Sequence, residues 1–286
     1  ARNIGADVAV GDWVVVSADG ERVESVLPRA SAFTRRASFV GDRAEADTIA
    51  ANIDTVGLVH SLTSPPNPRR LERELVLAFD SGASPVIVVT KRDLVDDPSE
   101  TIDALGAVAA GVAVVSASGI SGEGLAELRG HVRVHGTMAL LGASGVGKST
   151  LVNALAGRVA QRTSAVRAGD QRGRHTTTAS ELIALPDGRW LIDTPGVRAL
   201  SLWSSGHGIE RAFPDVFDLA DHCRFRDCKH EDEPGCAVRT AIESGALDPR
   251  RLDAMKRLVA EELALEEEQR AQEKLLDRRG VRRPRR

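Results

Sequence analysis

A glycine-rich segment near the middle of the chain has the residue types and spacing of a phosphate-binding loop. It reads Gly142-Ala-Ser-Gly-Val-Gly-Lys-Ser149, which fits the pattern Gly-x4-Gly-Lys-Ser. Glycines let main-chain N–H groups wrap a phosphate, the lysine reaches the β- and γ-phosphate oxygens, and the serine hydroxyl can ligate Mg²⁺. Only five of the 38 basic residues are lysines, so a lysine at this position is more informative than an arginine would be. We predict a phosphate site formed by Gly142, Ala143, Ser144, Gly145, Val146, Gly147, Lys148, Ser149 and Thr150.

A second candidate motif, which begins with an aspartate, follows an apolar run further along the chain. Asp193 ends the run Trp190-Leu-Ile192 and opens Asp-Thr-Pro-Gly196. Its carboxylate is placed to hold Mg²⁺ through water, and the Gly196 amide can meet the γ-phosphate. An aspartate at a strand end is more often a turn residue, and the nearby phosphate loop reverses that preference.

Two pairs of polar residues could recognise a purine base. Thr90-Lys-Arg-Asp93 and Ser116-Ala117 both follow apolar runs, where ligands bind in doubly wound sheets. Asp93 could accept two hydrogen bonds from guanine, Lys91 could cover the purine face, and the Ala117 amide could meet O6. Adenine presents the wrong donors to that carboxylate, which disfavours an ATP-using enzyme. Asparagine is the usual first residue of this motif, and we expect the Thr90 hydroxyl to substitute for it; a surface turn is the alternative.

Three cysteines and a histidine have metal-ligand spacing. Cys223-x4-Cys228-x-His230-x5-Cys236 brings four ligands within fourteen residues, enough for one closed, structural zinc site. His222 is a less favoured ligand, and three buried free cysteines are the alternative to a metal. Three clustered cysteines do not make the disulfide framework of a secreted protein.

The elements that must position these residues follow from the hydrophobic pattern. From residue 49 to about 203, short β-branched runs alternate with helical stretches, which predicts an α/β fold with a mostly parallel sheet. We expect strands at 55–60, 85–90, 111–116, 137–142, 181–185 and 189–193, and helices at 69–81, 99–110 and 147–156. Residues 8–16 and 22–28 predict two strands joined by a tight turn, as in part of a small β-barrel. Residues 158–178 lack apolar periodicity and predict a long loop, and residues 249–277 predict helix.

The composition excludes several classes of protein. The chain has 286 residues, 42% hydrophobic and 28% charged, and no apolar run approaches the eighteen or so residues of a membrane span. Its N-terminus lacks the pattern of a signal peptide, so we expect a cytoplasmic protein that binds no membrane. With a net charge of -3, any nucleic-acid contact must be local. Candidates are Arg35-Arg36, Arg172, Arg174 and the six arginines of residues 278–286, for which a solvated tail is the alternative.

The order of the motifs is itself informative, because the base motifs precede the phosphate loop, the reverse of ordinary GTPases. This circular permutation, with Gly173-Arg-His-Thr-Thr-Thr178 and the cysteine cluster, resembles the ribosome small-subunit-dependent GTPase A family from about residue 10 to 260. The resemblance implies an oligonucleotide-binding (OB) barrel at 1–48, matched only in its latter part, a circularly permuted P-loop GTPase domain at 49–205, and a helical zinc-binding domain with a basic tail at 206–286. It also implies GTP or GDP, Mg²⁺ and one Zn²⁺ as ligands, and the small ribosomal subunit and its rRNA as partners. We further expect a monomer.

Hydrolysis needs an oriented water, and the residue that follows Asp193-Thr-Pro-Gly196 is unusual. Val197 follows Gly196 where many GTPases carry glutamine, and an aliphatic side chain cannot hydrogen-bond water. We therefore expect slow unassisted hydrolysis, with Lys148 and Gly196 on the phosphates and His175 positioning water once a partner orders its loop. A solvated loop histidine is the alternative for His175. One threonine of residues 176–178 is expected to ligate Mg²⁺ with Ser149 and Asp193, and Thr177 and Thr178 are the candidates. A nucleotide-sensing RNA-binding scaffold with incidental turnover is the second functional class.

Overall fold

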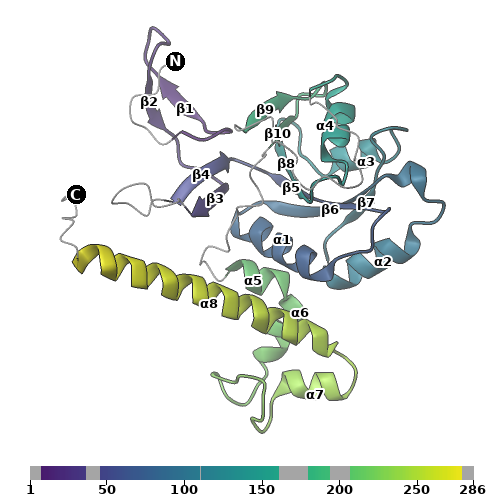
Figure 1. The fold of residues 1–286 in the computed structure, drawn as a ribbon, viewed down its shortest axis with the longest axis vertical. Coiled ribbons are helices and arrows are strands. Elements are labelled where there is room, and N and C mark those ends of the chain that lie inside the picture. Colours follow the sequence, from purple (N-terminus) through teal and green to yellow (C-terminus); the bar gives the residue numbers. More distant parts are fainter. Residues whose placement is uncertain (1–7, 37–45, 110, 161–179, 194–206, 279–286) are drawn as a thin grey trace. The chain divides into compact units, whose positions relative to one another are not determined.

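The computed structural model describes residues 8–36, 46–109, 111–160, 180–193 and 207–278. These residues form two compact units, the first ending at Asp193 and the second beginning at His207 (Figure 1). None of the helices within these ranges combines the length and the apolar character that crossing a membrane requires.

A six-stranded sheet is the centre of the first unit. Its strand order is β7 (Val114–Ser116), β6 (Ser84–Thr90), β5 (Thr55–Ser61), β8 (Thr137–Gly142), β10 (Trp190–Asp193) and β9 (Glu181–Ala184). Neighbouring strands are parallel throughout except for β9, which pairs antiparallel with β10. The predicted mostly parallel sheet is confirmed. The predicted strand bounds agree to within one residue, except that β7 begins three residues later.

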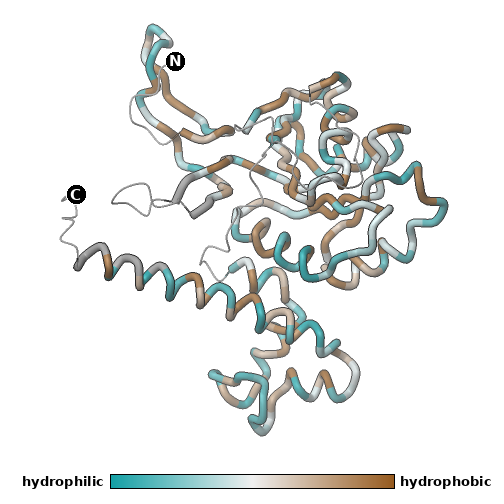
Figure 2. Tube along the Cα trace, in the orientation of Figure 1, coloured by the Kyte–Doolittle hydropathy of each residue, from teal (hydrophilic) through white to brown (hydrophobic). Residues whose placement is uncertain are grey.

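Helices cover both faces of this sheet. Helices α1 (Pro68–Asp80) and α2 (Ser99–Val108) lie on one face, and α3 (Leu125–Gly130) and α4 (Lys148–Ala156) on the other (Figure 1). Val59 and Val88 pack in the α3 and α4 core with Leu128 and Leu151. Successive side chains of a strand point to opposite faces, so the alternate residues of β5 and β6 face α1 and α2. A parallel sheet buried on both faces explains why its strands read as continuous apolar runs, which Figure 2 shows as brown segments at the centre of this unit.

The strand order creates a crevice at the carboxyl edge of the sheet. β6 and β7 lie on one side of β5, whereas β8 lies on its other side, so the direction of winding changes between β5 and β8. Ligands of doubly wound sheets bind outside the carboxyl ends of the strands at such a point. Thr90, Ser116, Gly142 and Asp193 each end a parallel strand at this edge. The fold therefore brings the predicted phosphate, base and magnesium motifs to one side of the sheet.

The N-terminal strands form two small antiparallel pairs. β1 (Val14–Val16) pairs with β2 (Val23–Val26), and β3 (Ala32–Arg36) pairs with β4 (Ala46–Ala51). The predicted tight turn is confirmed: the Ser17 amide donates to the Arg22 carbonyl at 2.9 Å, and Gly20 has a φ of +72°. Arg29 braces this region through two 2.8 Å bonds to the carboxylate of Asp12.

The second unit is helical. It contains α5 (His207–Ala212), α6 (Pro214–Ala220), α7 (Ala237–Glu243) and the long α8 (Pro249–Arg278), so the predicted helical C-terminal segment is confirmed. Phe213 is fully buried, and the Arg251 guanidinium lies over its ring at 4.4 Å. Arg251 also pairs with Asp215 at 2.7 Å, which fixes the start of α8 against α6.

Candidate nucleotide and zinc sites

The phosphate loop connects β8 to α4 through three glycines with positive φ. The angles are +152° at Gly142, +79° at Gly145 and +100° at Gly147. L-residues with a side chain rarely adopt these values. A Cβ on Gly142 would also lie 2.5 Å from the main-chain oxygen of Val59. The three glycines are therefore required for the turn, and Gly142 is also required for the close approach of the loop to β5.

Lys148 is the first residue of α4, and Ser149 and Thr150 follow it in the first turn. The Lys148 ammonium donates to the main-chain oxygens of Gly142 at 2.9 Å and Ala143 at 2.6 Å, which holds it across the phosphate loop. The first amides of a helix lack intrahelical acceptors, and they carry the positive end of the helix dipole. The ammonium and these amides together have the chemistry of an anion-binding site.

Thr90 connects the base motif to the phosphate loop. Its side chain is buried, with its hydroxyl oxygen 3.0 Å from the main-chain oxygen of His60 and within hydrogen-bond distance of that of Val146. These contacts join the ends of β5 and β6 to the phosphate loop. In the structure the Thr90 hydroxyl therefore bonds to the main chain of neighbouring elements.

Asp93 is held by a residue that the sequence did not single out. One of its carboxylate oxygens accepts a hydrogen bond from the Ser118 hydroxyl at 2.5 Å. Ser118 is fully buried, and its oxygen accepts the amides of Ile120 and Ser121, both at 3.0 Å. The carboxylate therefore has a fixed orientation before any ligand binds.

The structure differs from the prediction for Ser116 and Ala117. The Ala117 amide donates to the main-chain oxygen of Val89 at 2.8 Å, so this donor belongs to the sheet ladder instead of facing a base. The Ser116 hydroxyl oxygen is buried, and no partner for it exists among the described residues. The ladder continues past the end of β7, and the base loop begins at Ser118. The sequence feature that could have marked this loop is the glycine at position 119. In the structure a Cβ on Gly119 would lie 2.9 Å from the main-chain oxygen of Thr150.

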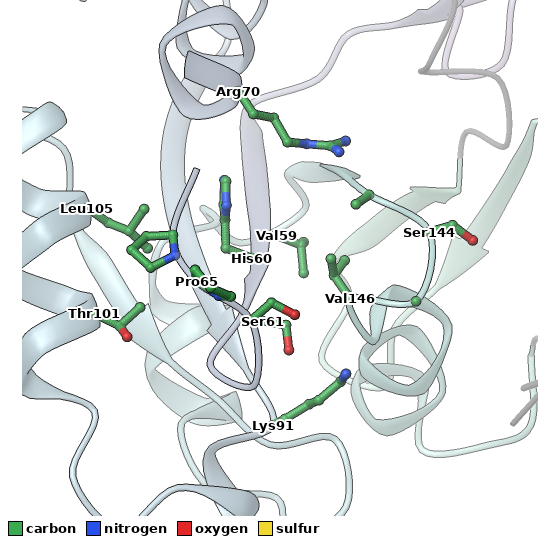
Figure 3. A pocket seen from close by; sticks show the side chains of 14 residues that line it. Val59, His60, Ser61, Pro65, Arg70, Lys91, Thr101, Leu105, Ser144 and Val146 are labelled. Carbon is green, nitrogen blue, oxygen red and sulfur yellow. The ribbon is translucent and has the colours of Figure 1, made fainter. Parts of the chain in front are cut away.

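Lys91 and the phosphate loop face a common cavity. Lys91 has a φ of +63°, and its ammonium donates to the Thr63 hydroxyl at 3.2 Å. A cavity of about 350 Å³ is lined by Lys91 and by residues 143–146 of the phosphate loop, together with residues of β5, α1 and α2 (Figure 3). The predicted base and phosphate residues are thus adjacent in space although they lie far apart in the sequence.

Asp193 occupies the end of β10, beside the strand that leads into the phosphate loop. Ile192 pairs with Ala139 of β8 in parallel register, which places Asp193 level with Leu140, just before the loop begins. The remaining predicted residues of this site, His175, Thr177, Thr178 and Gly196, lie outside the described residues, as do Val197 and the arginines at 172 and 174.

The cysteine cluster has the dimensions of a tetrahedral metal site. The ligand atoms of Cys223, Cys228, His230 and Cys236 all lie within 4.8 Å of one another. The Sγ atoms of Cys223 and Cys236 are 3.8 Å apart, and His230 Nδ1 lies 3.7 Å and 3.4 Å from them. Two sulfurs bound to one tetrahedral zinc at about 2.3 Å lie about 3.8 Å apart. The donor set and its spacing therefore fit one Zn²⁺ with no position left open.

The surroundings of the cluster shift the pKa values of three of its side chains. Burial acts to raise the pKa of Cys223, but hydrogen bonds from the amides of Val238 and Ala237 and from the thiols of Cys236 and Cys228 together outweigh it, so the pKa lies below its ordinary value. Burial and the neighbouring thiols raise the pKa of Cys228 to about 11. Burial and the positive charge of Lys256 lower the pKa of His230, which favours the neutral imidazole that a metal requires. Cys236 also caps α7 by accepting the Arg239 amide at 3.4 Å.

Comparison with known protein families gives a match over most of the first unit. The model of the RsgA GTPase family matches residues 26–203. A small ribosomal subunit biogenesis GTPase RsgA from Streptomyces coelicolor is 46% identical over 259 residues, covering 89% of this chain and 70% of the relative. A protein of the same name from Methanosarcina acetivorans is 42% identical over 264 residues, covering 91% of this chain and 71% of the relative.

Solved structures resemble the chain as well. YjeQ from Thermotoga maritima superposes with a TM-score of 0.66 at 28% identity, covering 90% of this chain and 84% of that one. YloQ, described as a circularly permuted GTPase, gives a TM-score of 0.64 at 27% identity, covering 89% of this chain and 80% of that one. A circular permutation, which the order of the motifs predicts here, is therefore described for a solved structure of similar fold.

Proposed function

Because the chain belongs to the RsgA GTPase family, we propose that it binds and hydrolyses GTP during late maturation of the small ribosomal subunit. Its relatives are named for small ribosomal subunit biogenesis. The nucleotide state controls docking on the subunit and its rRNA, and hydrolysis, stimulated by the subunit, promotes release. The protein acts as a monomer in the cytoplasm.

One observation carries this proposal: the phosphate loop and Asp93 meet at the carboxyl edge of one sheet although the base motif precedes the loop in sequence. The Lys148 ammonium and the α4 amides bind the phosphates, and Asp93 accepts from guanine. The base loop from Ser118 onward takes the place that the sequence assigned to Ser116 and Ala117. Ser149 and Asp193, with Thr177 or Thr178, hold Mg²⁺, which neutralises charge on the phosphates.

Hydrolysis is slow in the free protein under this proposal. Val197 cannot orient water, so His175 takes that role when the subunit orders its loop, while Lys148 and the Gly196 amide contact the phosphates. Residues 1–48 contribute part of an OB-like RNA-binding barrel, residues 49–205 the GTPase domain, and residues 206–286 a zinc-binding domain with a basic tail. The zinc ion holds Cys223, Cys228, His230 and Cys236 together and takes no part in hydrolysis.

The decisive experiment measures single-turnover GTP hydrolysis with purified small subunits, with large subunits and with neither. We expect stimulation by small subunits alone, with nucleotide affinity changing less than the rate. Equal rates in all three conditions, with binding to small subunits retained, would favour a nucleotide-sensing RNA-binding scaffold instead, which Val197 also favours. His175→Ala should retain GTP binding and lose the stimulated rate; full stimulation of this variant would leave His175 as a loop residue only.

A further inference from the structure

The cavity beside the phosphate loop contains a positively charged residue, Arg70, that the proposed nucleotide site does not use. Arg70 enters from α1, and Figure 3 shows its guanidinium directed toward the side of the cavity formed by Val146 and Ser144. Lys91 lines the opposite part. None of the fourteen residues that line the cavity is acidic. The space therefore favours an anion over a cation or a neutral apolar molecule.

A buried network fixes the orientation of Arg70. Its Nε donates to one carboxylate oxygen of Glu74 at 2.7 Å, and the other oxygen lies 3.1 Å from His60 Nε2. Glu74 and His60 are both buried, whereas the Arg70 side chain is 37% exposed. Glu74 accepts from Nε, and Figure 3 shows the end of the guanidinium directed toward the phosphate-loop side of the cavity. A planar guanidinium held in this way can donate two parallel hydrogen bonds to a phosphate.

The start of α1 adds to this anion preference. Asn67 caps the helix by accepting the Arg70 amide at 3.1 Å, and Pro68 occupies its first position. Ser64, Pro65 and Pro66, which immediately precede the cap, line the cavity. The positive end of a 13-residue helix thus lies on the same side of the cavity as Arg70.

We propose that Arg70 binds a phosphoryl group in this cavity, beside residues 143–146 of the phosphate loop. The group is either the terminal phosphate of GTP or a separate inorganic phosphate, such as the product of hydrolysis. The proposal rests on the proposed binding of guanine nucleotides at the phosphate loop. Glu74 and His60 are positioning residues, since they act through Arg70.

The test compares the parent protein with Arg70→Gln and with Arg69→Gln, a matched control because Arg69 is the exposed neighbour on α1. Three quantities are measured: affinity for GDP and for a GTP analogue with a non-hydrolysable β–γ bridge, single-turnover hydrolysis, and the rise in melting temperature of the GDP-bound protein on adding inorganic phosphate. Arg70→Lys is the second variant, retaining the charge without the planar fork, should Arg70→Gln lower the melting temperature.

The expected result is that Arg70→Gln retains GDP affinity within about twofold and loses at least about tenfold in analogue affinity or hydrolysis rate, which assigns the terminal phosphate. Loss of stabilisation by inorganic phosphate alone would assign the free anion. The inference is overturned when Arg70→Gln, or Arg70→Lys if only that variant folds, matches Arg69→Gln in every measurement. A parent protein that binds neither nucleotide would contradict the proposed function. The rise in melting temperature on adding inorganic phosphate, measured then on the nucleotide-free parent and variants, would still decide the role of Arg70.

Discussion

The side-chain hydroxyl of Thr90 lies within hydrogen-bond distance of the main-chain oxygen of Val146, a residue 56 positions further along the chain. The contact joins the first residue of the predicted base motif to the predicted phosphate loop. We therefore expect a ligand that orders one motif to affect the other through this buried hydroxyl.

The Thr90→Val variant tests this connection. Valine has nearly the same shape but leaves the oxygens of His60 and Val146 without the hydroxyl, so we expect a loss of about 1–2 kcal/mol in the free energy of unfolding. Affinity for GTP and GDP should fall by the same factor, because both nucleotides use the phosphate loop. Denaturant unfolding and nucleotide titration measure the two effects. Thr137→Val, at a half-buried position on β8, is the control, and a Thr90 variant that behaves like it would contradict the connecting role.

Removing the ammonium of Lys148 should weaken nucleotide binding and leave the fold intact. A charged hydrogen bond contributes about 1.5–3 kcal/mol, so Lys148→Ala should lower GTP affinity by about tenfold to a hundredfold. Lys274→Ala, an exposed lysine on α8, is the matched control. Zinc content and melting temperature should stay close to the parent values in both variants. An unchanged GTP affinity in titration calorimetry would remove the phosphate-loop assignment.

Base specificity should depend on the carboxylate of Asp93. In Asp93→Asn the side chain gains an amide donor that matches a carbonyl at purine C2, so GTP affinity should fall and xanthosine triphosphate affinity should rise relative to it. Competition binding with the two nucleotides measures the change. Retention of the parent preference for GTP would contradict the base assignment.

The partner of Asp93 should affect affinity without changing specificity. Ser118→Ala keeps the carboxylate but removes the donor that orients it at 2.5 Å. We expect GTP affinity to fall about fivefold to tenfold, the effect of one hydrogen bond, with no gain for xanthosine triphosphate. Ser116→Ala is the comparison, because its hydroxyl has no partner among the described residues. A larger loss in Ser116→Ala than in Ser118→Ala would restore the assignment made from the sequence.

Zinc removal should unfold the segment between α6 and α7. Metal analysis should return one zinc per chain, and a chelator should lower the melting temperature of the helical unit, because so short a segment has little core of its own. Cys236→Ser should lose the metal and weaken the start of α7, which Cys236 caps. His222→Ala should keep the metal. Zinc loss in the His222 variant, or none in the parent, would contradict the ligand set.

Local patterns in the sequence were sufficient to predict the loop between β8 and α4, the order of the motifs and the cluster of three cysteines and a histidine. The phosphate loop needs glycines at positions with positive φ, and the cluster of three cysteines and a histidine is defined by spacing within fourteen residues. Both are properties of a short stretch of chain, so a single sequence carries them. The parallel sheet was predictable for a related reason: strands buried on both faces must be apolar throughout.

Relationships between distant segments required the tertiary structure. Ser116 and Ser118 both follow the same apolar run, and which of them meets Asp93 depends on the register of β7 against β6, which places the Ala117 amide on Val89. The pairing of His60 with Glu74 likewise depends on how α1 packs on β5. Strand register and helix packing are decided by the summed contacts of whole elements, so neither pairing is visible in the types or the spacing of the residues involved.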